Sequence, residues 1–266
     1  MSLQFCSLSS GSSGNSYLVF TEDTYILVDA GISSKKIAES LARLNLTPYD
    51  LSAVLLTHEH SDHIKGAEIL SRKYGLPLYT NEQTYHAVFP LMKNTEGVIF
   101  YEFETNNPFT LNDIEIMPFP VSHDAVEPVG FSFYRENTKI SIATDTGCIN
   151  AKMMEEIISA NLLILEANHD EHMLKMGKYP WFLKQRILSA KGHLSNEAAG
   201  DAIAHMIHSH PINRQILLAH LSRENNFPEM AHQTVKNVLE ENNLFLNRSI
   251  RMDLLHRDQM SSVFAL

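Results

Sequence analysis

Short runs of hydrophobic residues recur along the chain, and several of them end in a polar residue. Five such runs end in a side chain that can bind a metal or move a proton: Tyr25–Asp29, Ala53–His58, Ile140–Asp145, Leu162–Glu166 and Ile216–His220. Runs of this length, bounded by turn signals, predict buried β-strands. Because ligands gather where the strands of layered α/β proteins end, we expect the five polar ends to line one edge of the core as an active site.

The segments between these runs carry helical patterns and further strand patterns. Hydrophobic residues recur at helical spacing in Ile64–Tyr74, Ala151–Ala160, Asn196–His208 and Glu229–Glu241. Residues Phe109–Phe133 predict a series of strands with Pro118 and Pro120 as breaks. The ending, Ser249–Leu266, predicts another strand pair. The expected fold class is therefore α/β, with strands and helices mixed in one domain and helices covering sheets.

The composition is that of a globular protein. Hydrophobic residues make up 44% and charged residues 20% of the 266 positions, which excludes a disordered chain. No hydrophobic run approaches the roughly 20 residues that cross a bilayer, and no secretion signal is visible at the N-terminus. We therefore expect no membrane partner. Cys6 and Cys148 are far apart and form no CxxC pair, which indicates a reducing, cytoplasmic location.

The net charge argues against simple electrostatic binding to nucleic acid, but its distribution is uneven. The chain holds 21 basic and 31 acidic residues, a formal net charge of −10, whereas a protein held on DNA by general electrostatics is usually basic. The segment His172–His193 nevertheless contains no Asp or Glu. Its basic residues are Lys175, Lys178, Lys184, Arg186 and Lys191. A basic segment of this kind is typical of a solvated helix surface. The alternative is that it contacts the backbone of a nucleic acid.

The strongest chemical signal is Thr57-His58-Glu59-His60-Ser61-Asp62-His63, which follows a predicted strand. Its three imidazoles and one carboxylate match the nitrogen and oxygen ligands of zinc, manganese or iron. They are too many for one ion that must leave a position open for water, so we expect two ions about 3.5–4 Å apart to share them. Further candidate ligands at the ends of later strands are His123, Asp145 and His220.

This pattern resembles the metallo-β-lactamase superfamily. The resemblance rests on HxHxDH after a hydrophobic strand, a later lone His, an Asp in Thr-Asp-Thr-Gly and a late His, and it extends from Asp29 to His220. The segments Gly11–Ser16 and Gly192–Asn196 are similar, more narrowly, to the YycJ/WalJ (VicX) branch, whose members are described as DNA 5′-exonucleases. The resemblance implies a four-layer αββα sandwich, here as a single domain of residues 1–266.

The same resemblance implies a ligand set for two divalent ions, Zn or Mn. One ion would be held by His58, His60 and His123, and the other by Asp62, His63 and His220, with Asp145 as the bridge between them. Asp29 would support the ligands from behind without binding metal itself.

Three features favour a phosphodiester as the substrate. By the resemblance, an Asp at position 145 is typical of the nucleases and thioesterases of the superfamily, whereas its β-lactamases usually lack it. Segment 192–196 is similar to a nuclease motif whose His contacts the scissile phosphate, so His193, Ser195 and Asn196 are candidate substrate contacts. Ser195 is also expected to cap the following helix. Glu166 resembles a Glu that orients this His, although a buried Glu paired with a cation would have the same pattern.

These features predict a metal-dependent phosphodiesterase, most specifically a DNA 5′-exonuclease. Hydroxide would attack phosphorus, with Asp62 accepting the proton of the water and His193, oriented by Glu166, protonating the leaving oxygen. Lys184 and Arg186 would contact the nucleic-acid backbone, with DNA favoured over RNA as the partner. Whether other proteins bind the chain stays unknown from the sequence.

Other functions remain open at this point. A thioesterase or lactonase would use the same metal ligands but would need neither the basic segment nor His193. A mononuclear iron oxygenase of the superfamily would hold one metal per chain. A catalytically silent adaptor would have no need of a complete ligand set. The loop Ser9–Ser16 is compatible with either a tight turn or a phosphate contact.

Overall fold

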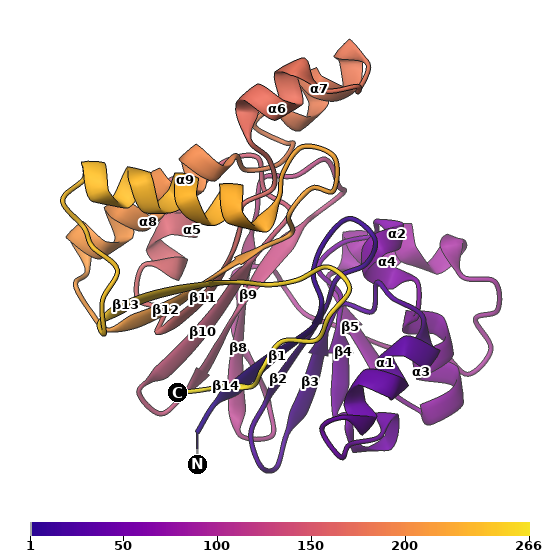
Figure 1. Ribbon diagram of the computed structural model, residues 1–266. Helices are drawn as coiled ribbons and strands as arrows, with labels where there is room; N and C mark the ends of the chain where they lie inside the picture. The colour runs from indigo at the N-terminus through magenta and orange to yellow at the C-terminus, as the bar shows by residue number, and fades with distance from the viewer. Residues whose placement is uncertain (1) are drawn as a thin grey trace.

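The structure, a computed structural model, describes residues 2–266. Within these residues, two β-sheets of seven strands each pack face to face (Figure 1). In spatial order, the first sheet contains β14 (Phe264–Ala265), β1 (Gln4–Ser9), β2 (Ser16–Phe20), β3 (Tyr25–Val28), β4 (Ala53–Leu55), β5 (Pro77–Thr80) and β6 (Ile99–Glu102). The second contains β13 (Ile250–Leu254), β12 (Arg214–Ala219), β11 (Leu162–Glu166), β10 (Thr138–Ala143), β9 (Val129–Arg135), β8 (Ile114–Pro120) and β7 (Phe109–Leu111).

Helices cover the outer face of each sheet (Figure 1). On the side of the first sheet lie α1 (Ser34–Ala42), α2 (Ser61–Ile64), α3 (Ala67–Tyr74) and α4 (Glu82–Val88), with the 3₁₀ turns η1 (Pro48–Asp50) and η2 (Phe89–Leu91). On the side of the second sheet lie α5 (Ala151–Ile157), α8 (Asn196–Ser209) and α9 (Pro228–Glu241). These layers confirm the predicted αββα sandwich. None of the helices within residues 2–266 is both long and hydrophobic enough to cross a bilayer.

Strand β11 shows why the central strands are hydrophobic at every position. Leu162 and Ile164 belong to the core between the two sheets, whereas Leu163 and Leu165 pack against the helices on the outer face. Successive side chains of a strand alternate between its faces, so a strand that is covered on both sides carries a continuous hydrophobic run. The first polar side chain, Glu166, comes only at the last residue of the strand.

The predicted strands and helices lie close to their expected positions. The five runs with polar ends form β3, β4, β10, β11 and β12, and the four helical patterns correspond to α3, α5, α8 and α9. β3 pairs in parallel with β4, and β11 pairs in parallel with both β10 and β12. Parallel neighbours end at the same edge of a sheet, so this topology brings the polar ends together.

Two predictions about the remaining strands are wrong. Pro118 and Pro120 do not break the strands, because both lie inside β8 and pair there with β9. Their positions tolerate proline because β7 pairs only with the first part of β8, which leaves the far edge of β8 without a neighbouring strand at the prolines. The C-terminal residues do form two strands, but these do not pair with each other. β13 joins β12 in the second sheet, and β14 joins β1 in the first.

Candidate metal centre

The candidate site lies where parallel strands of both sheets end. The polar residues at these ends are Asp29 and His58 from the first sheet, and Asp145, Glu166 and His220 from the second. The carboxylate of Asp145 lies between histidines that follow strands of the two sheets. Its Oδ2 lies 3.4 Å from His63 Nε2, and its Oδ1 lies 3.4 Å from His220 Nδ1. The polar ends therefore meet at one edge of the core, as the hydrophobic pattern predicted.

The backbone is strained at three of these positions. Asp29, Asp145 and His220 have φ angles of 59°, 57° and 54°, in the left-handed region that residues other than glycine seldom occupy. Each such residue costs of order 1–3 kcal/mol, and strain of this kind persists where the surrounding structure enforces it, commonly at functional sites. The strained residues are three of the predicted site residues, which indicates that the edge is built for chemistry more than for stability.

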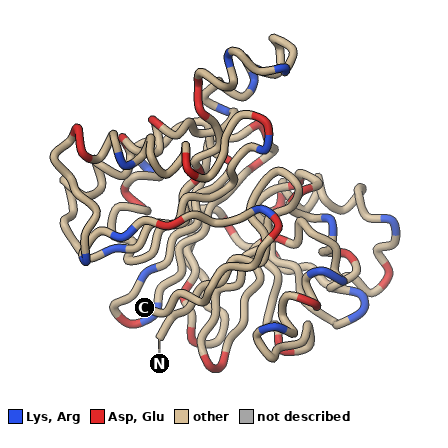
Figure 2. The backbone as a smooth tube through the Cα atoms, viewed as in Figure 1, with Lys and Arg blue, Asp and Glu red and all other residues tan. Residues whose placement is uncertain are grey.

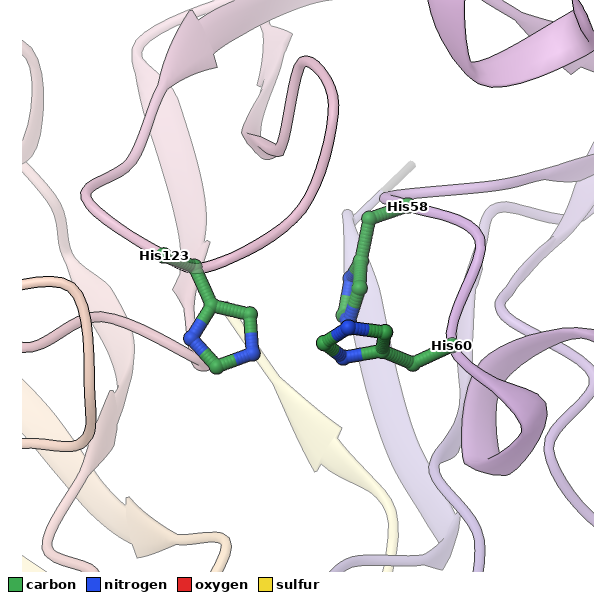
Figure 3. A group of neighbouring side chains, drawn as sticks. All are labelled: His58, His60 and His123. Carbon is green, nitrogen blue, oxygen red and sulfur yellow. The ribbon is translucent and has the colours of Figure 1, made fainter. Parts of the chain in front are cut away.

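The first group of candidate ligands consists of His58, His60 and His123. One ring nitrogen from each lies within 4.8 Å of the others, and the three rings point toward one another (Figure 3). His58 and His60 come from the loop after β4, whereas His123 follows β8. His58 and His60 are thus joined in one cluster by His123, which lies some 60 positions later in the chain, as the predicted ligand set requires.

The buried histidines of this group are neutral and oriented by hydrogen bonds. The Nδ1 of His123 donates to the Gly192 carbonyl at 3.0 Å, and the Nδ1 of His58 lies 2.9 Å from the Thr57 hydroxyl. Burial lowers the pKa of His123, and burial together with the neighbouring His63 holds the pKa of His58 well below its usual value. A neutral imidazole with its Nδ1 occupied presents the lone pair of Nε2, the state that binds metal.

The second group surrounds Asp145. His63 and Asp145 together with His58 have ligand atoms within 4.8 Å of one another, as do Asp145 and His220 with Glu166 and His193. The Oδ2 of Asp62 lies 3.8 Å from His63 Nε2. Burial raises the pKa of Asp145, but the imidazoles of His220 and His63 outweigh it and hold the pKa well below the usual range. The carboxylate is therefore ionised in the centre of the cluster.

Asp29 lies behind His63, on the side away from the cluster. Its fully buried carboxylate accepts a hydrogen bond from His63 Nδ1 at 2.7 Å and from the Thr57 backbone N–H at 2.9 Å. Burial lowers the pKa of His63, but Asp29 and then Asp145 outweigh it and raise this pKa to about 10. The position between the two carboxylates thus favours a positive charge, which either a proton or a metal ion supplies.

The carboxylate of Glu166 lies between two histidines, the buried His220 and the partly exposed His193. Its Oε1 lies 2.7 Å from His193 Nδ1 and 2.8 Å from His220 Nδ1, while its Oε2 accepts from the Thr146 backbone N–H at 2.8 Å. Burial opposes ionisation of Glu166, but the two imidazoles, His193 first, lower its pKa to about 2. Burial likewise opposes protonation of His193, but Glu166 outweighs it and raises the pKa of His193 to about 9.

Several buried polar atoms of the cluster lack any hydrogen-bond partner. They are His58 Nε2, Asp145 Oδ2 and His220 Nε2. Buried polar atoms are nearly always paired, and an exception marks a strained or catalytic group or a site for water or an ion. Imidazole nitrogens and carboxylate oxygens are the ligands that zinc and manganese accept. The residues therefore fit a metal centre.

Comparison with known proteins agrees with this geometry. The profile of a family described as "Beta-lactamase superfamily domain" matches residues 24–221. The chain is also 45% identical to exodeoxyribonuclease YycJ of Bacillus anthracis over 241 residues, 91% of this chain and 90% of that protein. The chain belongs to the metallo-β-lactamase superfamily.

Two further comparisons locate the chain within that superfamily. It is 44% identical to exodeoxyribonuclease WalJ of Streptococcus pneumoniae over 239 residues, 89% of this chain and 88% of that protein. The crystal structure of the metallo-β-lactamase-fold protein YhfI from Bacillus subtilis covers 100% of both chains with a TM-score of 0.73. Because YhfI is 18% identical to this chain, that likeness concerns the fold alone. The predicted resemblance to the YycJ/WalJ branch is confirmed.

The residues expected to contact substrate do not all face the same cavity. A cavity of about 160 Å³ beside the candidate metal centre is lined by His193, Arg186, Tyr179 and Ser12, among others. Arg186 is ion-paired there with Asp124. Of the five predicted contacts, His193 and Arg186 therefore lie at the cavity.

The other three predicted contacts have partners elsewhere. Ser195 caps α8 as expected, since its hydroxyl accepts from the Ala198 N–H at 3.2 Å. Asn196 is fully buried, and its amide pairs with Asn226. The Lys184 ammonium donates to the Lys175 carbonyl at 2.7 Å.

Sequence reasoning missed two residues beside the centre. The Asn15 amide lies 3.1 Å from His63 Nε2, and the carboxylate of Asp124 has one oxygen 3.4 Å from His123 Nε2. Asn15 follows Gly14, whose φ of 149° and close approach to Gly31 (a Cβ would lie 2.6 Å from its carbonyl) leave no room for a side chain. The predicted tight turn is confirmed, because the Gly14 N–H donates to the Gly11 carbonyl at 2.8 Å.

Proposed function

We propose that this protein is a metal-dependent phosphodiesterase that degrades DNA, and specifically that it removes nucleotides from the 5′ end. The observation that carries the proposal is His193: it is held by a buried carboxylate, borders an open cavity and adjoins the candidate metal ligands. The relatives that match along about nine-tenths of their length are named exodeoxyribonucleases. The 5′ polarity follows the resemblance to their branch.

In this proposal the centre holds two divalent ions, Zn or Mn. His58, His60 and His123 would hold one ion and Asp62, His63 and His220 the other, and Asp145 would be shared between them. The unpartnered buried atoms and the convergence of His58, His60 and His123 support this assignment. For the second ion, the support is the position of Asp145, 3.4 Å from both His63 Nε2 and His220 Nδ1. When bound, such a pair of ions supplies hydroxide at neutral pH and offsets the negative charge of the reacting phosphate.

The residues of the chain then position the substrate and move protons. Glu166 accepts from His193 Nδ1, so the opposite ring nitrogen is left for the leaving oxygen, which it protonates. The side chain of Asp62 is 23% exposed and lies beside His63, where it accepts the proton of the attacking water. Arg186, with its side chain 57% exposed at the cavity, binds the phosphate backbone. Lys184, on the same helix with its ammonium at the Lys175 carbonyl, adds a second positive charge for the nucleic-acid backbone.

One experiment tests the function directly. Metal-loaded protein is incubated with DNA and RNA that carry a label at either the 5′ or the 3′ end, with and without a chelator. We expect mononucleotides to be released first from the 5′ end of DNA, and the chelator to abolish the release. Cleavage that survives chelation, or hydrolysis of thioesters and lactones with none of DNA, would overturn the proposal.

A further inference from the structure

An arm formed by residues 171–187 projects from the body of the protein beside the site (Figure 1). It contains α6 (Glu171–Met176) and α7 (Trp181–Ile187). Three of its large hydrophobic side chains are exposed to solvent: Met176 by 87%, Trp181 by 68% and Phe182 by 72%. Single exposed hydrophobic residues need no explanation, but several on one short projection mark an interaction surface.

The charge of the arm indicates the chemistry of its partner. Residues 172–193 carry five basic and no acidic side chains in a protein of net charge −10. The acidic residue of the arm, Glu171 at its start, is ion-paired with Lys175, and Figure 2 shows further blue positions along the arm. Within the described residues 2–266, Lys178 and Lys191 have no acidic side chain within ion-pair distance, and Lys184 bonds a backbone carbonyl. Exposed aromatic rings among unneutralised cations are how proteins hold single-stranded nucleic acid, with bases on the rings and phosphates at the cations.

The surface of the arm is continuous with the candidate active site. Tyr179 and Arg186 of the arm line the same cavity as His193. The end of α7 is bonded directly to that residue, since the His193 N–H donates to the Ile187 carbonyl at 3.0 Å. Gly192 permits this close packing, because a Cβ there would lie 2.2 Å from the same carbonyl. A strand bound at the cavity is therefore within reach of the arm.

We propose that the arm binds single-stranded DNA next to the scissile phosphate, with Trp181 and Phe182 stacked on its bases. Lys178, Lys184 and Lys191 are then available to the phosphates. The bases of a duplex are already stacked on one another, so the rings select an unpaired strand. This inference rests on the proposed nuclease function, but strand binding is measured separately from cleavage.

The chain provides its own reporter, because Trp181 is its one tryptophan. The full-length, metal-loaded protein is titrated with a phosphorothioate-linked thymidine strand of about 12 nucleotides, within the size that single-strand-binding surfaces occupy. We expect the strand to quench the emission of Trp181. An abasic strand of equal length and charge should bind about tenfold more weakly, because it offers no base to stack.

A second measurement removes the rings and keeps the charge. In Trp181→Leu and Phe182→Leu proteins, anisotropy of a labelled thymidine strand should show binding weakened about tenfold, and KM for a single-stranded substrate should rise by a similar factor. Trp181→Tyr keeps a ring and should restore most of the binding. The matched control is Phe245→Leu, which removes another aromatic ring, 59% exposed, from the loop after α9. It should bind and cleave like the wild type.

Four results would overturn the proposal. They are equal quenching by the thymidine and abasic strands, wild-type affinity in the leucine variants, tighter binding of a duplex than of a single strand, and leucine variants that turn a dimer into a monomer with DNA affinity unchanged. The last result would identify the arm as a contact between two copies of the chain. If the strand binds as expected but no DNA is cleaved with any metal, the nuclease function fails and the arm proposal stands.

Discussion

The two histidine groups of the centre are built in different ways. His58 and His123 are neutral, and their Nδ1 atoms face a hydroxyl and a backbone carbonyl. His193 and His220 instead share one buried carboxylate, Glu166, which lies within 2.8 Å of both. A neutral imidazole offers a lone pair to a metal, whereas Glu166 raises the pKa of His193 to about 9, so that His193 retains a proton. The comparison separates His58 and His123, which present a lone pair to a metal, from His193, which carries a proton at the edge of the cavity.

The strongest way to break this comparison is to remove a ligand. We expect His60→Ala or Asp145→Ala to abolish nuclease activity, because an ion that lacks one of its few ligands is lost or misplaced. The fold should change little, since His60 is only partly buried and Asp145, although buried, follows the end of β10 outside the hydrophobic core. Circular dichroism, metal analysis and DNA cleavage measure the three effects. His86→Ala is the control, because that residue is 65% exposed on α4. Activity that persists in the Asp145 variant would contradict a bridging role.

Removal of His193 separates proton transfer from metal binding. His193→Ala should retain its metals and slow turnover by about 10²–10⁴-fold, the usual contribution of a general acid. Metal content and single-turnover DNA cleavage are measured on the same sample. His205→Ala serves as the control, since His205 is exposed on α8, away from both the centre and the arm. Cleavage at the wild-type rate would end the phosphate role of His193.

Glu166→Gln tests whether this one carboxylate supports both proton transfer by His193 and metal binding by His220. The amide keeps the shape of the side chain but loses the charge that holds His193 and His220. Loss of such a supporting residue typically costs 10–100-fold in activity or metal affinity, and here we expect both to fall by about that factor. A variant that loses activity but keeps wild-type metal affinity would show that Glu166 acts on His193 alone.

Asp29→Asn perturbs the support of His63 only. We expect a smaller loss, about tenfold in the affinity of one metal ion, because the Thr57 contacts to the side chain partly remain. Calorimetric titration with Zn or Mn separates the two binding events. Equal weakening of both events would mean that Asp29 supports the whole centre.

The smallest effect is the pH dependence of the metal-free protein. The raised pKa of His193, about 9, means that its pairing with Glu166 stabilises the fold fully below pH 6.5, and this stabilisation is lost as the pH rises toward 9. The lowered pKa of Glu166, about 2, means that its contribution is full above pH 4.5 and lost as the pH falls toward 2. Between these limits the pair is intact. NMR titration of chelated protein should show His193 protonated at pH 7 and His58 and His123 neutral. A neutral His193 would remove the difference between the groups.

Much of the fold and of the centre follows from local pattern. The hydrophobic run 162–165 predicts a strand buried on both faces, and the packing of β11 bears this out. His58 and His60 are two positions apart directly after a strand, where their side chains can point the same way, so the sequence alone predicts that the two rings lie close together. The prolines of β8 were misjudged because sequence shows that proline lacks an N–H but not which edge of the strand is free.

The sequence by itself determined the strands with polar ends, the helices between them and the kinds of ligand available, because these depend on neighbours within a few residues. The four layers were implied by the resemblance to a family and not by local pattern. Only the tertiary structure decided that Glu166 lies between His193 and His220, that Asn15 meets His63 and that Asn196 is turned into the interior. It also decided that residues 171–187 leave the body as an exposed arm. Contacts between distant segments depend on how the sheets pack and where each strand stops, and the chain encodes this only through all of its packing at once.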